Sequence, residues 1–517
     1  MPNALAGDPV PMTERQRNGL LRRADWRFLL PDPRPGRLLC VGSTELRDAC
    51  SAIGARVDTT PDSDDGLYDA VVLSEADDQT IATAAARLRP GGSLYGEWRA
   101  GAVNDVRHRL ARAGFADVGC YHPWPDPPVT EIWVPADAPW TFDYFETVDR
   151  HVYSGARHRF GTRVRRALAR RRLARTSGTL LCAVAQKPGG GSEEPALVDA
   201  ARRAAHIPNA SRLTLALLTG GPRAISKVVG VAFADGAHDP LLVVKWPRVR
   251  ESEPGLVREA TALAASYERG PAPGVPRLLA RSGNDGSLGI AESAARGVPM
   301  FTRITRDNVA SLTRLGASWL ASFGVRERRP VDRHALRTLV DGELRRFTET
   351  FGGVAEPGLI DKTAKLCNAV EVPFVIEHRD FGPWNLFLDD MRRLTALDWE
   401  SSRVHGLPLL DLLYFISYMA FFVEGAMAAR NFAEVYRATL DPRSGHGALR
   451  QELLEEHREL LGISSSAVRA LRALCWIGHA ESEFQHFSAD AGGAPTPEAL
   501  RGSVFMQLWR EEILSLR

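Results

Sequence analysis

The residues best suited to chemistry lie in one short segment, "VIEHRDFGPWNLFLDDMRRLTALDWESS", which runs from Val375 to Ser402. Asp380 and Asn385 are five residues apart across a Gly-Pro turn, and Asp398 follows a further apolar run. A carboxylate such as Asp380 can accept the proton of an attacking hydroxyl. The oxygens of Asn385 and Asp398 are hard ligands of the kind that Mg²⁺ takes alongside substrate phosphates. The spacing therefore predicts a magnesium-dependent phosphoryl-transfer site.

Short apolar runs flank these residues and must position them. "PFVIE" and "LFLDD" are typical of short strands, so the turn between them is expected to be a rigid loop. "LTALDWE" is expected to be a strand that ends at Asp398. The alternative is a structural turn in which the same side chains only cap and hydrogen-bond.

A second group of candidate residues lies upstream. The runs "RLTLALLTGG", "SKVVGVAFA" and "PLLVVKWPR" predict three antiparallel strands, and Lys245 ends the third. Glu259 follows in the predicted helix "PGLVREATALAASYERG". Gly220 and Gly221 in the first turn allow the backbone to approach a phosphate closely.

These motifs carry a resemblance to a known family. H-x-D-x-x-x-x-N followed by D-W-E resembles the catalytic core of aminoglycoside phosphotransferases, which share a protein-kinase-like fold with choline kinase and type II homoserine kinase. The resemblance implies that Asp380 is the catalytic base, that Asn385 and Asp398 bind Mg²⁺, and that His378 anchors the loop. Asp411 in "GLPLLDLLYF" resembles a family Asp that braces the catalytic loop from a helix N-terminus.

The resemblance also assigns the nucleotide side of the site. It implies that Lys245 pairs with the α- and β-phosphates of ATP and that Glu259 orients it. The remaining cofactor-binding candidates are two glycines and a serine of the first turn, and the inter-lobe hinge "GIAESAARGVP", whose backbone would face adenine: Gly220, Gly221, Ser226, Glu292, Ser293 and Ala294. The chain departs from related kinases by lacking G-x-G-x-x-G and by having Arg379 where aminoglycoside enzymes have Gly.

The function implied is ATP- and Mg²⁺-dependent transfer of the γ-phosphate to a hydroxyl of a small molecule, such as an antibiotic, a sugar, an amino alcohol or a natural-product intermediate. The acceptor and the oligomeric state cannot be read from the sequence. Glu400, Glu481 and Glu483 offer an acidic surface for a cationic acceptor, a reading that we do not favour because surface carboxylates are common. A non-catalytic ATP-binding scaffold is an alternative.

The first part of the chain alternates strand-like and helical runs, which predicts a doubly wound α/β sheet. "RLLCVGSTELRDACSAIGARVDTT" and "ARLRPGGSLYGEW" resemble a class I methyltransferase fold. The cofactor loop departs from that pattern, with Cys40 near the usual acidic position and only Gly42 after the strand. S-adenosylmethionine is therefore not expected, and we favour a scaffolding domain over a bifunctional methyltransferase-kinase.

The expected fold is thus an α/β, Rossmann-like methyltransferase domain followed by a bilobal kinase-like domain with an antiparallel sheet and a mainly helical lobe. The predicted ranges are an N-terminal extension at 1–36, the methyltransferase-like domain at 37–187, a linker at 188–196, the kinase N-lobe at 197–296 and the C-lobe at 297–517.

Bulk composition narrows the class of protein. The 517 residues have a net charge of +2, which argues against a dedicated nucleic-acid binder, and the basic run at 157–176 is read as a solvated helix face. The six cysteines form no CxxC pair, which fits a reducing cytoplasm. The apolar run Leu412 to Val423 is too short to span a bilayer and predicts a buried helix, so no membrane insertion is expected.

Overall fold

The computed structural model describes residues 12–60, 67–99, 102–127, 129–148, 180–189, 194–208, 213–221, 223–282, 289–368, 370–491 and 495–516. The chain forms two compact units. The first holds the described residues within 1–149, 159–256 and 278–294, and the second those within 257–277 and 295–517. The basic run at 157–176 lies outside the described residues.

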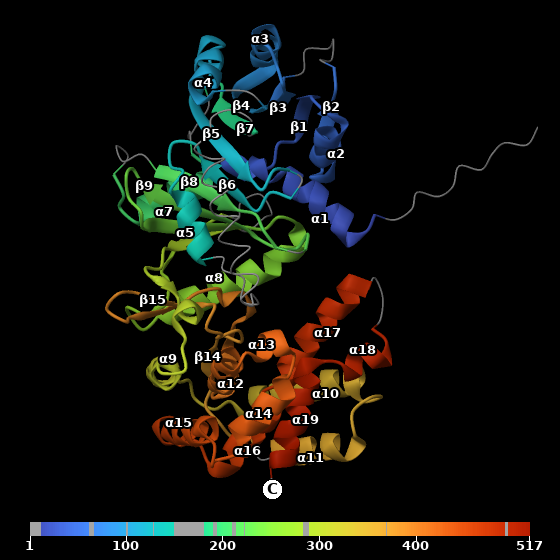
Figure 1. Ribbon diagram of the computed structural model, residues 1–517, viewed down its shortest axis with the longest axis vertical. Coiled ribbons are helices and arrows are strands. Elements are labelled where there is room, and N and C mark those ends of the chain that lie inside the picture. Colours follow the sequence, from blue (N-terminus) through green and yellow to red (C-terminus); the bar gives the residue numbers. More distant parts are fainter. Residues whose placement is uncertain are drawn as a thin grey trace, which may run out of the picture. The chain divides into compact units, whose positions relative to one another are not determined.

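The first unit is built on one sheet of twelve strands, in the order β11-β12-β10-β9-β8-β6-β5-β7-β4-β3-β1-β2. Figure 1 shows the blue and cyan strands of the N-terminal part leading into the green strands β8 and β9. The strands are β1 (Arg37–Val41), β2 (Arg56–Asp58), β3 (Tyr68–Ser74), β4 (Leu88–Trp98), β5 (Ala116–Trp124), β6 (Ile132–Pro135), β7 (Leu181–Gln186), β8 (Leu213–Leu218), β9 (Val228–Ala234), β10 (Pro240–Trp246), β11 (Leu278–Arg281) and β12 (Ile290–Ser293).

The N-terminal strands form a mainly parallel α/β layer. β2, β1, β3 and β4 pair in parallel, and β7 lies antiparallel between β4 and β5. The connecting helices are α2 (Thr44–Ala52), α3 (Asp78–Arg87) and α4 (Val103–Arg112). α3 begins after the cap Asp77, whose side chain accepts from Thr80 N, and it ends where β4 starts. The alternation of strands and helices predicted for this part of the chain is confirmed, whereas nothing in this topology identifies a methyltransferase.

An antiparallel group of strands follows in the same sheet. β8, β9, β10 and β12 pair in that order, as the three apolar runs predicted. The sheet is continuous because β6 pairs with β8, through Ile132 opposite Leu218 and Trp133 opposite Leu217. The predicted domain ranges stay a prediction. The single sheet, however, contains strands from both the predicted methyltransferase-like domain (37–187) and the predicted kinase N-lobe (197–296).

Residues before β1 are part of the folded core of this unit. α1 (Glu14–Arg23) starts with a capping box between Thr13 and Gln16, and the short helix η1 (Asp25–Leu29) follows. Trp26 is fully buried and stacks on Tyr95 of β4 with ring centroids 4.4 Å apart. The first unit also contains α5 (Thr141–Val148), α7 (Ala196–Ala204) and η2 (Arg250–Ser252).

The second unit is mainly helical. α12 (Leu410–Glu424) is its centre: it is apolar all round, and ten of its residues are buried, as the run Leu412 to Val423 predicted. Figure 1 shows the yellow to red helices gathered around it, and α12 contacts α9, α14, α15 and α16. The helices are α8 (Glu253–Tyr267), which leads into this unit, α9 (Val309–Glu327), α10 (Arg333–Phe351), α11 (Pro357–Cys367), α13 (Ala426–Ala429), α14 (Phe432–Leu440), α15 (Gly445–Leu461), α16 (Ser465–Leu474), α17 (Ile477–Ala491), α18 (Pro497–Arg501), α19 (Val504–Ser515), and the short η3 (Met300–Arg303) and η4 (Trp399–Ser401).

Five short strands complete the second unit. β13 (Val298–Pro299), β15 (Leu386–Leu388) and β16 (Leu394–Ala396) form one sheet, and β14 (Val375–Glu377) pairs with β17 (Arg403–Gly406) in another. The strands predicted on either side of the Gly-Pro turn and before Asp398 are therefore present.

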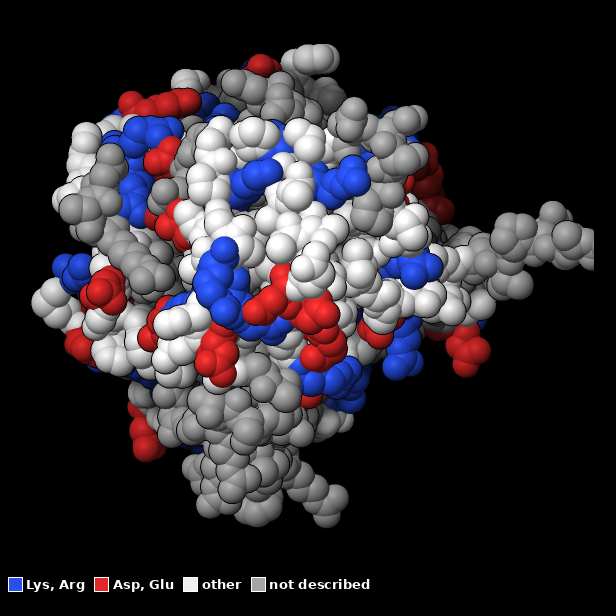
Figure 2. Space-filling view, turned by 90° about the horizontal axis from the view of Figure 1, so that it is seen from above, with Lys and Arg blue, Asp and Glu red and all other residues white. Residues whose placement is uncertain are grey.

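Two properties of the described residues bear on partners. No single described helix has the length and apolarity to cross a membrane; one pair, Gly445–Leu461 with Ser465–Phe484, passes that test only jointly and is bent by 118°. On the face drawn in Figure 2, basic and acidic side chains alternate over the surface. That pattern suits a chain with a net charge of +2.

Packing around α12 gives a first prediction. A Cβ atom on Gly316 of α9 would lie 2.4 Å from the Phe415 ring of α12, so Gly316→Ala should overpack this interface and destabilise the second unit by about 1–3 kcal/mol. Gly342 of α10 meets nothing closer than Arg346 Nη1 at 3.5 Å. Gly342→Ala should therefore be stabilising by up to about 1 kcal/mol through helix propensity. Thermal unfolding of both variants checks the opposite signs, and equal effects would contradict the packing.

Candidate active site

The segment that opened the sequence analysis forms a compact loop in the second unit. Asp380 and Asn385 lie between β14 and β15, and Asp398 follows β16. The Asn385 side-chain nitrogen donates to the Asp380 carboxylate at 2.8 Å and to its main-chain oxygen at 3.0 Å. Leu397 N donates to Asn385 O at 2.8 Å, which ties the loop to the residue before Asp398. The structure thus brings the three predicted residues together.

Asp380 lies in an enclosed and partly like-charged environment. Burial, followed by the Asp398 carboxylate, raises the pKa of Asp380 to about 7. Three donors act in the opposite direction: Asn385, the Tyr414 hydroxyl at 3.1 Å and the Trp384 indole nitrogen at 3.4 Å. Asp380 is therefore held in place. Its carboxyl group gains and loses a proton around neutral pH, as a general base working there must.

Asp411 holds the main chain of this loop from the first turn of α12. Its two carboxylate oxygens each accept a 2.7 Å hydrogen bond, one from His378 N and one from Arg379 N. Arg379 has a φ of 67°, a left-handed conformation that costs energy for a residue with a side chain. Burial and the nearby Glu377 raise the pKa of Asp411 to about 7. The carboxylate thus offsets a strained turn directly before Asp380.

His378 connects two parts of the loop while being 1% exposed. Its Nε2 lies 2.9 Å from Leu397 O, and its Nδ1 accepts from Asp380 N at 3.3 Å. A neutral ring protonated on Nε2 satisfies both contacts. These contacts suit the anchoring role predicted for His378 and leave no nitrogen for a metal.

Asp398 is itself in a left-handed conformation, with a φ of 64°, at the start of η4. Trp399, the next residue, donates its main-chain nitrogen to the fully buried Glu259 at 3.2 Å. Glu259 was predicted to orient Lys245, and that role stays a prediction. The contact with Trp399 N shows that Glu259 also fixes the chain beside Asp398.

Lys245 lies near the end of β10 in the first unit, as predicted. Its ammonium group is 2.7 Å from Glu292 Oε1 of β12, and both residues are buried. Val243 is directly opposite Glu292, so Lys245 and Glu292 are diagonal neighbours on one face of the sheet. From the sequence, Glu292 was expected only in the hinge. The signal for its contact with Lys245 was a pair of charged residues in adjacent buried strands, and the prediction missed it.

The loop between β8 and β9 contains the predicted glycines. Gly221 has a φ of 109°, and a Cβ atom there would lie 2.5 Å from Ser226 Oγ, so the turn requires glycine at this position. Ser226 N donates to Arg223 O at 3.1 Å, which closes the turn. At the hinge, Ala294 N donates to Leu241 O at 3.3 Å, and the adenine-facing role of Glu292, Ser293 and Ala294 stays a prediction.

The donor set around Asp380 is suited to a magnesium ion. The Asn385 amide nitrogen is used by Asp380, so the carbonyl oxygen is the atom that would bind a cation. The Asp398 carboxylate supplies a second hard oxygen, and the like charge that Asp398 imposes on Asp380 is the kind a cation neutralises. Among the described residues, no group of three or more His, Cys, Asp or Glu side chains gathers into a metal site.

The predicted acidic surface is dispersed among separate contacts. Glu481 accepts from the Thr350 hydroxyl at 3.1 Å, Glu483 accepts from Ser503, and Glu400 lies in η4. A role in binding a cationic acceptor stays a prediction.

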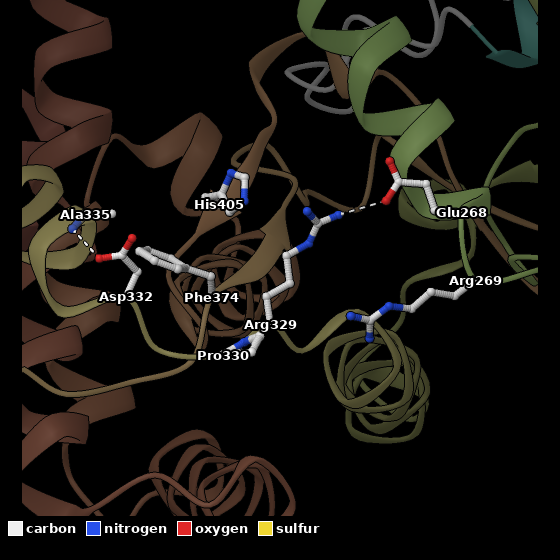
Figure 3. Close-up of a pocket in the computed structure, with 8 residues that line it drawn as sticks. All are labelled: Glu268, Arg269, Arg329, Pro330, Asp332, Ala335, Phe374 and His405. Atoms are coloured by element: carbon white, nitrogen blue, oxygen red, sulfur yellow. Dashed lines mark hydrogen bonds and ion pairs between the residues drawn. The ribbon is translucent and has the colours of Figure 1, made fainter.

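A separate open pocket lies elsewhere in the second unit. Figure 3 shows its lining, in which Arg329 points toward Glu268 at 3.5 Å and Asp332 accepts from Ala335 N. The volume is 480 Å³, and the lining residues are Glu268, Arg269, Arg329, Pro330, Asp332, Ala335, Phe374 and His405. None of them belongs to the predicted site.

Three solved structures that are similar to this chain are aminoglycoside phosphotransferases. An apo form of a thermostable mutant of aminoglycoside phosphotransferase APH(4)-Ia has a TM-score of 0.36 and 13% identity, and the match covers 59% of this chain and 95% of that chain. The GDP complex of aminoglycoside 2'-phosphotransferase-IIIa has a TM-score of 0.36 and 13% identity, covering 61% and 97%. Aminoglycoside-3'-phosphotransferase of type VIII has a TM-score of 0.28 and 19% identity, covering 50% and 98%.

All three TM-scores are below 0.5. No protein-family model matches the sequence. No curated protein matches it significantly.

The Asp411 contacts predict a measurable loss of stability. Asp411→Ala removes two hydrogen bonds from a carboxylate to the strained turn, so at pH 8 it should lower the free energy of unfolding of the second unit by about 2–4 kcal/mol. Asp390→Ala, at a fully exposed carboxylate in the same segment, is the control and should change it by less than about 0.5 kcal/mol. Denaturant unfolding checks both, and matching values would contradict the bracing role.

Proposed function

We propose that the protein is an ATP- and Mg²⁺-dependent phosphotransferase that acts on a hydroxyl of a small molecule. The observation that carries the proposal is the grouping of Asp380, Asn385 and Asp398 in one enclosed loop, with the Asp380 carboxylate hydrogen-bonded to Asn385 and electrostatically coupled to Asp398. A base beside two hard oxygen ligands is what phosphoryl transfer requires of a protein.

Each residue of the loop has a distinct part in this proposal. The carboxylate of Asp380 would accept the hydrogen bond of the acceptor hydroxyl and orient its oxygen toward the γ-phosphorus. Tyr414 and Trp384 hold that carboxylate by donating to it. Asn385 and Asp398 would hold Mg²⁺, which supplies charge neutralisation for the triphosphate when bound.

The nucleotide side of the proposal rests on the first unit. Lys245 is a buried cation fixed by Glu292, so its position does not depend on its flexible stem. Such a lysine can neutralise phosphate oxygens at a defined place. The left-handed Gly221 lets the backbone of the β8–β9 loop approach a phosphate without a side chain in between.

We propose that the N-terminal α/β layer is a scaffold and not a second catalytic domain. Ligands of α/β sheets bind at the carboxyl ends of the parallel strands. At that edge, Arg23 of α1 forms a two-point contact with Glu97, near the end of β4, at 2.6 and 2.7 Å, and lies 3.5 Å from Glu45, in the first turn after β1. Asp58, the last residue of β2 at the same edge, is paired with Arg37 at 2.9 Å.

The alternative of a bifunctional methyltransferase-kinase makes a different prediction about ligands. Calorimetric titration of the whole chain with S-adenosylmethionine should detect no binding. Saturable binding would favour the bifunctional protein.

Aromatic rings around Asp380 bear on the acceptor. The Tyr414 and His479 rings stack with centroids 4.3 Å apart, and Trp384 lies edge-on to Tyr418 at 4.9 Å. Of these four rings, Trp384 and His479 are partly exposed, so a ring-bearing hydroxyl compound could contact these two, whereas Tyr414 and Tyr418 are buried. A panel of hydroxyl compounds with labelled ATP, which includes aminoglycosides, sugars and aromatic alcohols, would identify the class.

Substitutions of the loop carboxylates test the function directly. Asp380→Asn and Asp398→Asn should each lower kcat by about a thousandfold or more, because one removes the base and the other a metal ligand. Asp380→Asn should still bind ATP with Mg²⁺, whereas Asp398→Asn should need more Mg²⁺. Steady-state phosphotransfer with the best acceptor of the panel, or ATP turnover, measures both.

Asp390→Asn is the matched control and should retain wild-type turnover, since its side chain is fully exposed. Near-normal rates in Asp380→Asn would show that Asp380 is not the base and would contradict the proposed mechanism. Absence of ATP binding and turnover by the wild-type chain would favour a non-catalytic scaffold.

The pH dependence has a defined sign. Asp380 acts only when its carboxyl has lost its proton, so kcat should rise with pH to a plateau. Its pKa of about 7 in the unliganded protein is partly caused by Asp398. Mg²⁺ bound at Asp398 offsets that like charge and lowers the pKa, so the midpoint should lie at or below about 7. A kcat profile at saturating ATP that falls between about pH 6 and 8 would contradict this assignment.

A further inference from the structure

We propose that the N-terminal segment, α1 and η1, supports the nucleotide site from behind, and that Asn18 and Glu14 are positioning residues for the β8–β9 loop. The inference rests on the proposed nucleotide-binding function. The sequence marked residues 1–36 only as an extension, but the side chains of α1 bind the main chain of the loop that carries Gly220 and Gly221.

Two direct hydrogen bonds join α1 to this loop. The buried Asn18 donates its side-chain nitrogen to Gly221 O at 3.3 Å. The Glu14 carboxylate accepts from Ala224 N at 2.7 Å. These contacts fall on Gly221 and on a residue three positions later, so α1 holds the loop at two points.

A buried ion pair supports the same loop from the next element. Arg248 lies three residues after Lys245 and contacts Asp25 of η1 at 2.9 Å, with both side chains fully buried. The Arg248 guanidinium also donates to Thr219 O at 2.6 Å and to Arg223 O at 3.2 Å. One group thereby links η1, the end of the lysine-bearing strand, and the start and the middle of the loop.

Further contacts set the place of Arg248 and of the segment. Arg27 donates to Arg248 O at 2.8 Å. Arg22 donates to Thr130 O at 2.7 Å, and the Thr219 hydroxyl donates to the same oxygen at 3.1 Å. The segment is therefore attached to the strand ends around the loop as well as to the loop itself.

These contacts have a consequence for nucleotide binding. A glycine-containing loop that is free in solution loses conformational entropy when it closes on phosphate. Here the carbonyl groups of Thr219, Gly221 and Arg223 and the Ala224 N–H group are already bonded to side chains outside the loop. The loop is thus ordered before nucleotide arrives, and the N-terminal segment contributes to affinity without touching the ligand.

Substitution of the two positioning residues tests the proposal. Asn18→Ala and Glu14→Ala should each raise the KM for ATP about three- to tenfold, and the double variant more, with kcat within about twofold of wild type. Glu14→Gln keeps an acceptor oxygen for Ala224 N and should retain a KM close to wild type. Hydrogen exchange at the amides of Gly220, Gly221 and residues 223–226 should become faster in the double variant.

Arg17→Ala is the matched control. Arg17 is on the same helix but is exposed and contacts Glu251 at 2.8 Å, so its loss should change neither KM nor the exchange of the loop. A Lys245→Ala variant tests the proposed nucleotide-binding function separately from the positioning role of α1. If Lys245→Ala retains wild-type ATP affinity, the proposed function is wrong.

If Lys245→Ala loses ATP binding while the double variant keeps both wild-type KM and wild-type exchange, the positioning role is overturned. Faster exchange with an unchanged KM also overturns it, because order in the loop would then not matter for binding. A rise in KM that Arg17→Ala reproduces would show a general effect of α1 and would likewise overturn it.

Discussion

The carboxylates of Asp380 and Asp398 lie in one loop and repel each other, and hydrogen-bond donors of the second unit offset that repulsion. Asp398 raises the pKa of Asp380, and a pair of this kind is stable only when donors or a cation compensate it. Asn385, Tyr414 and Trp384 supply the donors. In the proposed function, a magnesium ion would remove the energetic cost that remains.

The first unit solves a comparable problem with opposite charges. Asp25 and Arg248 are both fully buried, and each would be costly to bury alone. Burial raises the pKa of Asp25, and the neighbouring arginines, Arg248 first among them, act against that shift. Because the guanidinium also binds Thr219 O and Arg223 O, the pair determines where the loop lies as well as satisfying its own charges. A hydrophobic pair of equal volume would pack but would not position the loop.

The sequence allowed prediction of features that are local in the chain. Asp380, Asn385 and Asp398 lie within 19 consecutive residues, and their spacing already required a loop between short strands. The Glu292 partner of Lys245 depends on cross-strand register, which the runs of apolar residues do not define. The N-terminal segment was missed for a related reason: Arg23 and Asp25 are charged residues typical of a surface. They are buried only because partners 74 and 223 residues away, Glu97 and Arg248, meet them in the fold.

The pairing of β6 with β8 has a consequence for how the protein can be divided. Without the residues before 197, β8 would become an edge strand whose apolar side chains and free main-chain groups face water. A fragment cut at the Gly-rich segment after Lys187 would therefore gain a surface prone to intermolecular strand addition. In this chain the N-terminal α/β layer therefore covers what would otherwise be an open edge of the neighbouring antiparallel strands, whatever ligand that layer itself does or does not bind.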